Sequence, residues 1–200
     1  MILYVESNFI LELAYLQEEY EHCERILTLA EDTSIGIVVP AFALAEPYST
    51  WVRQTQQRAD LHRRLTREIN QLSRSRPYAE SQKEFQEVTK ALLESGEDEK
   101  LRLHAVVERI LAVASLIPLE AQTMRAAIQI QKSAKLEPQD SIIYASILSH
   151  LQTAQDQPKC FVSRDSDFAD PEIRKELQSH GCDFAPNFRV AFGMAMKSTL

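Results

Sequence analysis

The chain opens with Ile2-Leu3-Tyr4-Val5-Glu6-Ser7-Asn8, and this stretch decides what fold to expect. Residues 2–5 form an apolar, β-favouring run, which predicts a short buried strand. Glu6-Ser7-Asn8 predicts a turn into a helix that begins near Phe9. A strand that leads directly into a helix is the unit from which alternating α/β folds are built.

The same alternation returns along the rest of the chain. Further strands are predicted at residues 35–39, 160–162 and 182–184, and the intervening segments are helical by their apolar spacing. Helices are expected over residues 101–116 and 119–136 and from Pro138 and Pro171 onward, with breaks at 73–77 and 95–98. Strands that alternate with helices imply a mostly parallel sheet covered by helices on both faces.

Composition places the chain among globular proteins with a sizeable core. Hydrophobic residues make up 44% and charged residues 26% of its 200 residues, so extended disorder is not expected. No apolar run approaches the length of a membrane span and no basic segment precedes the first one, so neither an anchor nor a secretory signal is predicted. Cys23, Cys160 and Cys182 have no Cys-x-x-Cys spacing. They indicate reduced thiols of a cytoplasmic protein, and neither a disulfide framework nor a zinc site.

Five acidic residues fall where such a sheet would place a ligand site. Ligands in open α/β sheets bind beyond the carboxyl ends of the strands. The acids that follow predicted strands are Glu6, Glu46, Asp165 and Asp167, and Asp140 lies in the first turn of a helix, whose partial positive charge favours a carboxylate. Each alone is more simply explained as a turn or cap residue. The net charge of −7 argues against a protein that coats nucleic acid, but not against a nuclease with a carboxylate site.

Together these acids lie in four ordered motifs that resemble those of the PIN-domain nucleases. The motifs are Tyr4-Val5-Glu6-Ser7-Asn8-Phe9, Ala43-Leu44-Ala45-Glu46, Gln139-Asp140-Ser141-Ile142-Ile143-Tyr144-Ala145-Ser146 and Val162-Ser163-Arg164-Asp165-Ser166-Asp167-Phe168. The last is the most specific and the second is the least. The resemblance implies a three-layer α/β/α PIN-like fold with a mostly parallel central sheet. It also implies a single domain over 1–200, with a helical insertion at approximately 52–116.

The resemblance further implies cleavage of single-stranded or structured RNA with Mg²⁺ or Mn²⁺, because hard cations prefer oxygen ligands. Glu6, Asp140 and Asp165 are expected to hold the metal, Asp140 and Asp165 being the main ligands. Glu46 is expected to complete the catalytic site, with Asp167 lying farther from the metal. Ser7, Asn8 and Ser163 are expected to hydrogen-bond the carboxylates in place.

The first motif departs from the family pattern, which usually has aspartate where this chain has Glu6. The change moves the carboxylate outward by one C–C bond of roughly 1.5 Å. A misplacement on the order of 1 Å can cost about a hundredfold in rate, unless the backbone recedes to compensate. A weak or silent enzyme is therefore an alternative interpretation.

The helical middle carries an arginine-rich segment in an otherwise acidic chain. One hypothesis is that it lies along RNA phosphates, and the other is an ordinary solvated helix face. The nucleic-acid contacts predicted on the first hypothesis are Arg53, Arg58, Arg63, Arg64, Arg67 and, outside this segment, Arg164. Trp51 could stack on a base, but anchoring of this helix to the core is the favoured interpretation.

Three functions compete at this stage. The first is an RNA endonuclease, either the toxin of a toxin–antitoxin pair or an RNA-processing enzyme. The second is a PIN-like RNA-binding module without catalysis. The third is a phosphatase or phosphoacceptor domain, which ranks well below because Glu6-Ser7-Asn8 supplies no nucleophilic aspartate. The partners expected from the resemblance are RNA, an antitoxin protein and a second copy of the chain. The apolar C-terminal residues could serve such a homodimer or close over the chain's own core.

Overall fold

A computed structural model of the protein describes residues 1–78, 82–133, 136–154 and 157–198. Its strands form one sheet in the order β3-β2-β1-β4-β5, and every neighbouring pair is parallel. The strands are β1 (Ile2–Tyr4), β2 (Gly36–Pro40), β3 (Ser115–Ile117), β4 (Lys159–Val162) and β5 (Cys182–Ala185). β1 therefore lies at the centre, with β2 on one side and β4 on the other.

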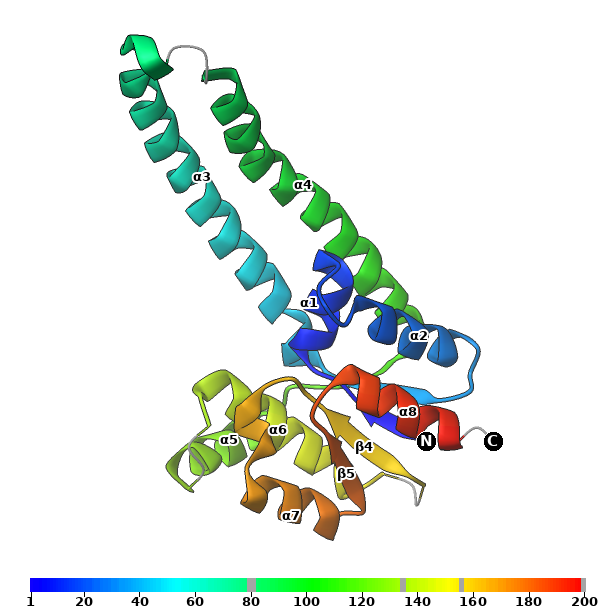
Figure 1. Ribbon diagram of the computed structural model, residues 1–200. Helices are drawn as coiled ribbons and strands as arrows, with labels where there is room; N and C mark the ends of the chain where they lie inside the picture. The colour runs from blue at the N-terminus through cyan, green and yellow to red at the C-terminus, as the bar shows by residue number, and fades with distance from the viewer. Residues whose placement is uncertain (79–81, 134–135, 155–156, 199–200) are drawn as a thin grey trace.

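Helices cover both faces of this sheet (Figure 1). One face carries α1 (Ser7–Tyr15), α2 (Tyr20–Glu31) and α8 (Phe188–Ser198), and the other carries α5 (Ala121–Ser133), α6 (Pro138–Leu151) and α7 (Pro171–Ser179). The predicted three-layer α/β/α arrangement is confirmed. Gly181 lies just past the end of α7 with a φ of 66°, and its N–H donates to the carbonyl of Gln178 at 2.9 Å, as is typical of a glycine at a helix C-terminus.

The helical middle of the chain forms a long antiparallel pair that extends away from the sheet (Figure 1). It consists of α3 (Glu46–Leu72), a short 3₁₀ turn (Arg76–Tyr78) and α4 (Gln82–Val113). α3 begins at Glu46 with Pro47 in its first turn, where the missing N–H costs no helical hydrogen bond. That this hairpin is an insertion into one domain of 1–200 stays a prediction.

The break predicted at residues 95–98 is wrong, because α4 continues through it. Ser95 does not cap a helix end, and its hydroxyl donates back to the carbonyl of Leu92 at 3.2 Å. Gly96 marks a close approach of the two helices. A Cβ there would lie 3.3 Å from the hydroxyl of Thr55, and the indole N–H of Trp51 donates to the Gly96 carbonyl at 2.8 Å. Trp51 thus links α3 to α4, and it also packs against the core, as favoured from the sequence.

The helix predicted over 101–116 is also wrong at its end. α4 stops at Val113, and residues 115–117 form β3 at the edge of the sheet. A strand of three residues with an exposed Leu116 has no alternation that could distinguish it from the end of a helix. The strand predictions at the other positions are confirmed within two residues.

The C-terminal helix α8 closes over the chain's own core. Phe188 is fully buried, and Phe192 and Met194 pack against the same core. Val190 remains exposed. Within the described ranges, none of the helices combines the length and apolar character needed to span a bilayer.

The C-terminal half of α4 is part of the hydrophobic core. Substitutions at two adjacent residues test this placement. Ile110 is fully buried, whereas its neighbour Leu111 is 45% exposed. We expect Ile110→Ala to lower the free energy of unfolding by about 2–5 kcal/mol. Leu111→Ala is the matched control and should change it by less than about 0.5 kcal/mol. Urea denaturation measures both, and equal losses would contradict the placement of α4.

Candidate active site

Glu6 is the residue at which the central strand turns into α1. Its backbone is extended, and its side chain caps the helix by accepting the N–H of Asn8 at 2.8 Å. The same oxygen accepts the hydroxyl of Ser7 at 2.9 Å, and the other oxygen accepts the hydroxyl of Ser163, which follows β4, at 3.1 Å. The contacts expected of Ser7, Asn8 and Ser163 are therefore present, and all three converge on Glu6.

Burial dominates the chemistry of this carboxyl group. Glu6 is only 2% exposed, and the loss of solvation raises its pKa to about 7. The three hydrogen bonds oppose this rise because they favour the ionised form, and the nearby charge of Glu46 adds to it. The carboxyl group of Glu6 therefore gains or loses its proton near neutral pH.

Asp165 is tied to Glu6 through the hydroxyl of Ser163. That hydroxyl donates to Glu6 and accepts the backbone N–H of Asp165 at 3.0 Å. Asp165 in turn caps the 3₁₀ turn Ser166–Ala169 by accepting the N–H of Asp167 at 2.8 Å. The loop after β4 is therefore fixed to the end of β1, which parallel pairing of these two strands places at the same edge of the sheet.

Asp140 enters from the opposite layer, in the first turn of α6. Its pKa is raised to about 6, first by burial and then by the negative charges of Asp165, Glu46, Asp167 and Glu137. Mutual repulsion of this kind requires that the carboxylates lie near one another. The structure thus brings together acids that are far apart in the sequence.

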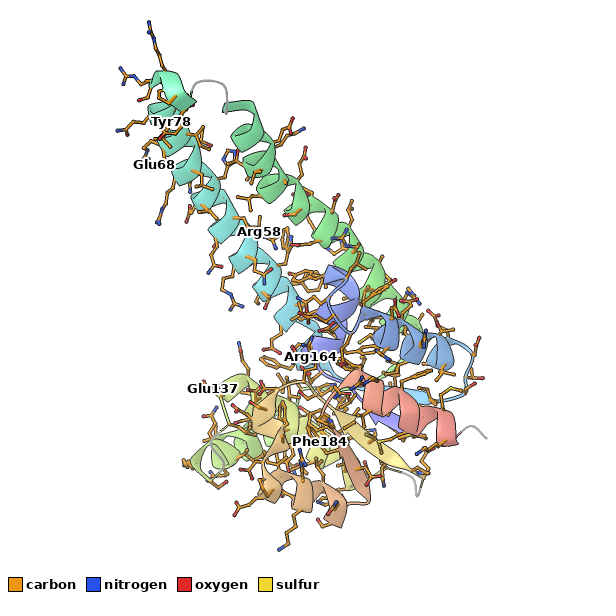
Figure 2. All side chains as sticks on the ribbon, in the orientation of Figure 1. Arg58, Glu68, Tyr78, Glu137, Arg164 and Phe184 are labelled. Carbon is orange, nitrogen blue, oxygen red and sulfur yellow. The ribbon has the colours of Figure 1, made fainter. Side chains whose placement is uncertain are left out.

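An open cavity of about 500 Å³ lies where these segments meet. Its walls include the carboxylates of Glu6, Glu46, Asp140 and Asp165, together with Thr50 and Leu11. Asp167 does not line it, and instead borders a neighbouring hollow beside Asp170. Glu137, which does line it, was not predicted, although its position three residues before Asp140 could have indicated it. Figure 2 shows Glu137 and Arg164 close to where the hairpin meets the sheet layers.

The donor set of this cavity suits a hard divalent cation. One carboxylate oxygen of Glu46 is buried and has no hydrogen-bond partner among the described residues, so it is an unsatisfied acceptor that a cation would satisfy. Among the residues that the structure describes, no three His, Cys, Asp or Glu side chains are close enough to hold a metal ion as they stand. The acids would have to draw together around a cation, which their repulsion otherwise prevents.

The predicted nucleic-acid contacts divide into paired and unpaired arginines. Arg58 pairs with Glu99 at 2.5 Å, Arg164 pairs with Glu12 and Glu18, and Arg63 pairs with Asp60. Arg53, Arg64 and Arg67 are exposed on α3 and form no ion pair among the described residues. None of the six lines the acidic cavity. Figure 2 shows Arg58 on α3, beside α4, and Arg164 beside α1.

Sequence comparison identifies the family to which this fold and site correspond. The profile of the PIN domain matches residues 3–168, and the chain belongs to the PIN domain family. No curated protein sequence matches it. Among solved structures, the chain is similar to one in the crystal structure of VapBC2 from Rickettsia felis bound to a fragment of promoter DNA. The two are 12% identical with a TM-score of 0.43, over 92% of this chain and 98% of that one.

The raised pKa of Glu6 predicts how stability depends on pH in metal-free protein. The folded state holds this proton more tightly than the unfolded state, whose carboxyl has an ordinary pKa near 4.5. Stability from this group is therefore complete below about pH 4.5 and is lost as pH rises toward 7, by at most about 3 kcal/mol. Urea unfolding in EDTA should show this loss, and Glu6→Gln should remove that part of it. Glu68→Gln on the exposed face of α3 is the control, and an equal effect of both variants would refute the assignment.

Proposed function

We propose that this protein is an endoribonuclease that hydrolyses RNA phosphodiester bonds with the help of Mg²⁺ or Mn²⁺. The observation that carries the proposal is the convergence of Glu6, Glu46, Asp140 and Asp165 on one open cavity. Membership of the PIN domain family supports a nuclease. The raised pKa of Asp140 supports a site whose charge a cation would relieve.

Asp140 and Asp165 would be the main ligands of the cation, together with Glu6, and the unsatisfied oxygen of Glu46 would complete the site. When bound, the cation would activate water and neutralise charge on the phosphate. Asp167 would lie outside the ligand set. Its negative charge raises the pKa of Asp140, and its backbone N–H donates to the carboxylate of Asp165. Ser163 is a positioning residue, because its hydroxyl fixes Glu6 and Asp165 relative to each other.

We propose that the exposed arginines of α3 contact RNA phosphates outside the cavity. Arg53, Arg64 and Arg67 form no ion pair among the described residues, and they lie on a helix that begins at Glu46, a residue of the proposed catalytic site. Arg63 forms an exposed ion pair with Asp60. Because exposed ion pairs are weak, this pairing leaves Arg63 available to contact a phosphate. Arg58 and Arg164 are paired with largely buried glutamates, so a structural role is simpler for them.

The alternative function is a PIN-like RNA-binding module that has little or no catalysis. It is favoured by one observation, namely that three donors already engage the carboxylate of Glu6. A carboxylate held this firmly has limited freedom to move toward a cation. This module would bind RNA but would not cleave it, even with Mn²⁺.

Partners and compartment follow from the same proposal. An antitoxin protein is the expected regulator if the chain is a toxin, and RNA alone is the partner if it is a processing enzyme. If the C-terminal stretch serves a homodimer, Val190 is available to it, because this residue remains exposed on α8. The three buried free cysteines are those expected of a reducing compartment, which supports the cytoplasm.

Cleavage of end-labelled single-stranded RNA tests the nuclease. With Mn²⁺, Asp140→Asn should cut at least about a hundredfold more slowly than the parent chain, because it removes a charged metal ligand. Mn²⁺ at about a hundred times its Kd should stabilise the parent by about 2.7 kcal/mol, and Asp140→Asn by much less. Cleavage that persists in EDTA would contradict the proposal.

Glu6→Asp belongs in the same assay, since it restores the residue usual in the family. If only the Glu6→Asp variant cleaves RNA, the native chain is a PIN-domain enzyme whose activity Glu6 suppresses. RNA binding without cleavage by any variant would favour the RNA-binding module.

The arginine contacts have their own test, which is the salt dependence of RNA affinity. Each phosphate contact to a single strand contributes about 0.7 to the slope of log K against log salt. Arg64→Gln/Arg67→Gln should therefore reduce the magnitude of that slope by about 1.4 in fluorescence anisotropy. Lys132→Gln/Lys175→Gln, at two exposed cations on α5 and α7, removes the same charge elsewhere. If both pairs reduce the slope equally, the arginines of α3 are not the contacts.

A further inference from the structure

A second cavity, of about 510 Å³, lies along the same faces of α1 and α3 as the acidic cavity. Its walls include Tyr15, Gln54, Gln57, Arg58, Leu61 and Glu99. The acidic cavity is lined on these two helices by Leu11 and Thr50. Leu11 and Tyr15 are four residues apart on α1, and Thr50, Gln54, Gln57 and Leu61 follow one another by four, three and four on α3. Residues at these spacings share one helix face, so the two cavities are successive sections of one surface.

This surface has the length and the charge order that a nucleic-acid strand would need. From Thr50 to Gln57 the helix axis advances by roughly 10 Å, which corresponds to about three nucleotides of a stacked strand. Arg64 lies three residues beyond Leu61 on the same face, and it is exposed without an ion pair among the described residues. The face therefore runs from carboxylates, through amides, to a free guanidinium.

The chemistry of the second cavity suits a neutral polar ligand more than a phosphate. Its arginine, Arg58, is already neutralised by Glu99 at 2.5 Å and also donates to the hydroxyl of Ser95 at 3.2 Å. The side chains of Gln54 and Gln57 each offer a donor and an acceptor. The hydroxyl of Tyr15 is buried without a hydrogen-bond partner among the described residues, which leaves one polar group in the wall unsatisfied.

We propose that this second cavity binds one unstacked base of the RNA, about three nucleotides from the bond held at the acidic cavity, and that Gln54 and Gln57 read its edge. Single-stranded RNA is recognised in this way, with bases splayed out, stacked on aromatic rings and hydrogen-bonded at their edges. The inference rests on the proposed function, because RNA at the acidic cavity defines the path of the strand. It adds a site of sequence preference that the carboxylates alone do not provide.

Binding of short labelled RNAs of uniform sequence (A, C, G or U) tests the inference. Three proteins are compared by fluorescence anisotropy in Mn²⁺, all carrying Asp140→Asn so that the RNA is not cut. One has no further change, one carries Gln54→Ala/Gln57→Ala, and one carries Gln56→Ala. Gln56 is the matched control, an exposed glutamine of the same helix that lies outside the second cavity. Alanine is favourable in helices, so the variants should fold, and circular dichroism checks this.

We expect the protein without further change to prefer one base by about tenfold in Kd. Gln54→Ala/Gln57→Ala should reduce that preference to about twofold or less, whereas Gln56→Ala should retain it. An unchanged ranking in the double variant, the absence of any preference, or no RNA binding would each overturn the inference. A side chain of a protein partner would then be the candidate occupant.

The base-preference test and the cleavage test can fail independently of each other. Loss of base preference in the double variant, with no cleavage by the chain that retains Asp140, would support the base site and refute the nuclease. Metal-dependent cleavage with no base preference would support the nuclease and refute the base site.

Discussion

Parallel pairing of β1 with β2 and β4 is the constraint on which the site depends. Leu3 lies between Ile37 and Cys160 in the sheet, so the three strands end at the same edge. The chain must leave each strand there, and Glu6 and Asp165 occupy two of those exits. The side chain of Ser163 then bridges the two loops. Glu6 and Asp165 are thus brought together by strand pairing and by the hydroxyl of Ser163 rather than by any attraction between them.

The consequence is electrostatic. Carboxylates that are buried and adjacent cannot all remain ionised without a counter-charge, and the raised pKa values of Glu6 and Asp140 express that cost. A proton and a divalent cation are two ways to meet it, and they compete. Metal affinity, proton uptake and the stability of the fold are therefore linked through the same few groups.

Most of the fold follows from local pattern, and the exceptions have physical causes. β-branched runs identified β2, and the apolar opening identified β1 with Glu6 at its end, so the position of Glu6 was predictable. β3 was missed because three edge residues carry no periodic signal. The continuity of α4 was missed because Gly96 resembles a break, whereas its role is to let α3 approach. Glu137, the second cavity and the partners of Arg58 and Arg164 depend on packing between distant segments, which spacing along one segment cannot reveal.

The hairpin of α3 and α4 has an architectural consequence. Of the 27 residues of α3, only Pro47 and Ile69 are buried, so most of this helix contributes little to the core. Its length could therefore change by whole turns, about 5.4 Å each, while the residues around the sheet keep their places. The proximal turns, which border both cavities, are held in register by Trp51 and Gly96. Related chains would then differ mainly in the length of this hairpin, and so in how far it extends from the sheet.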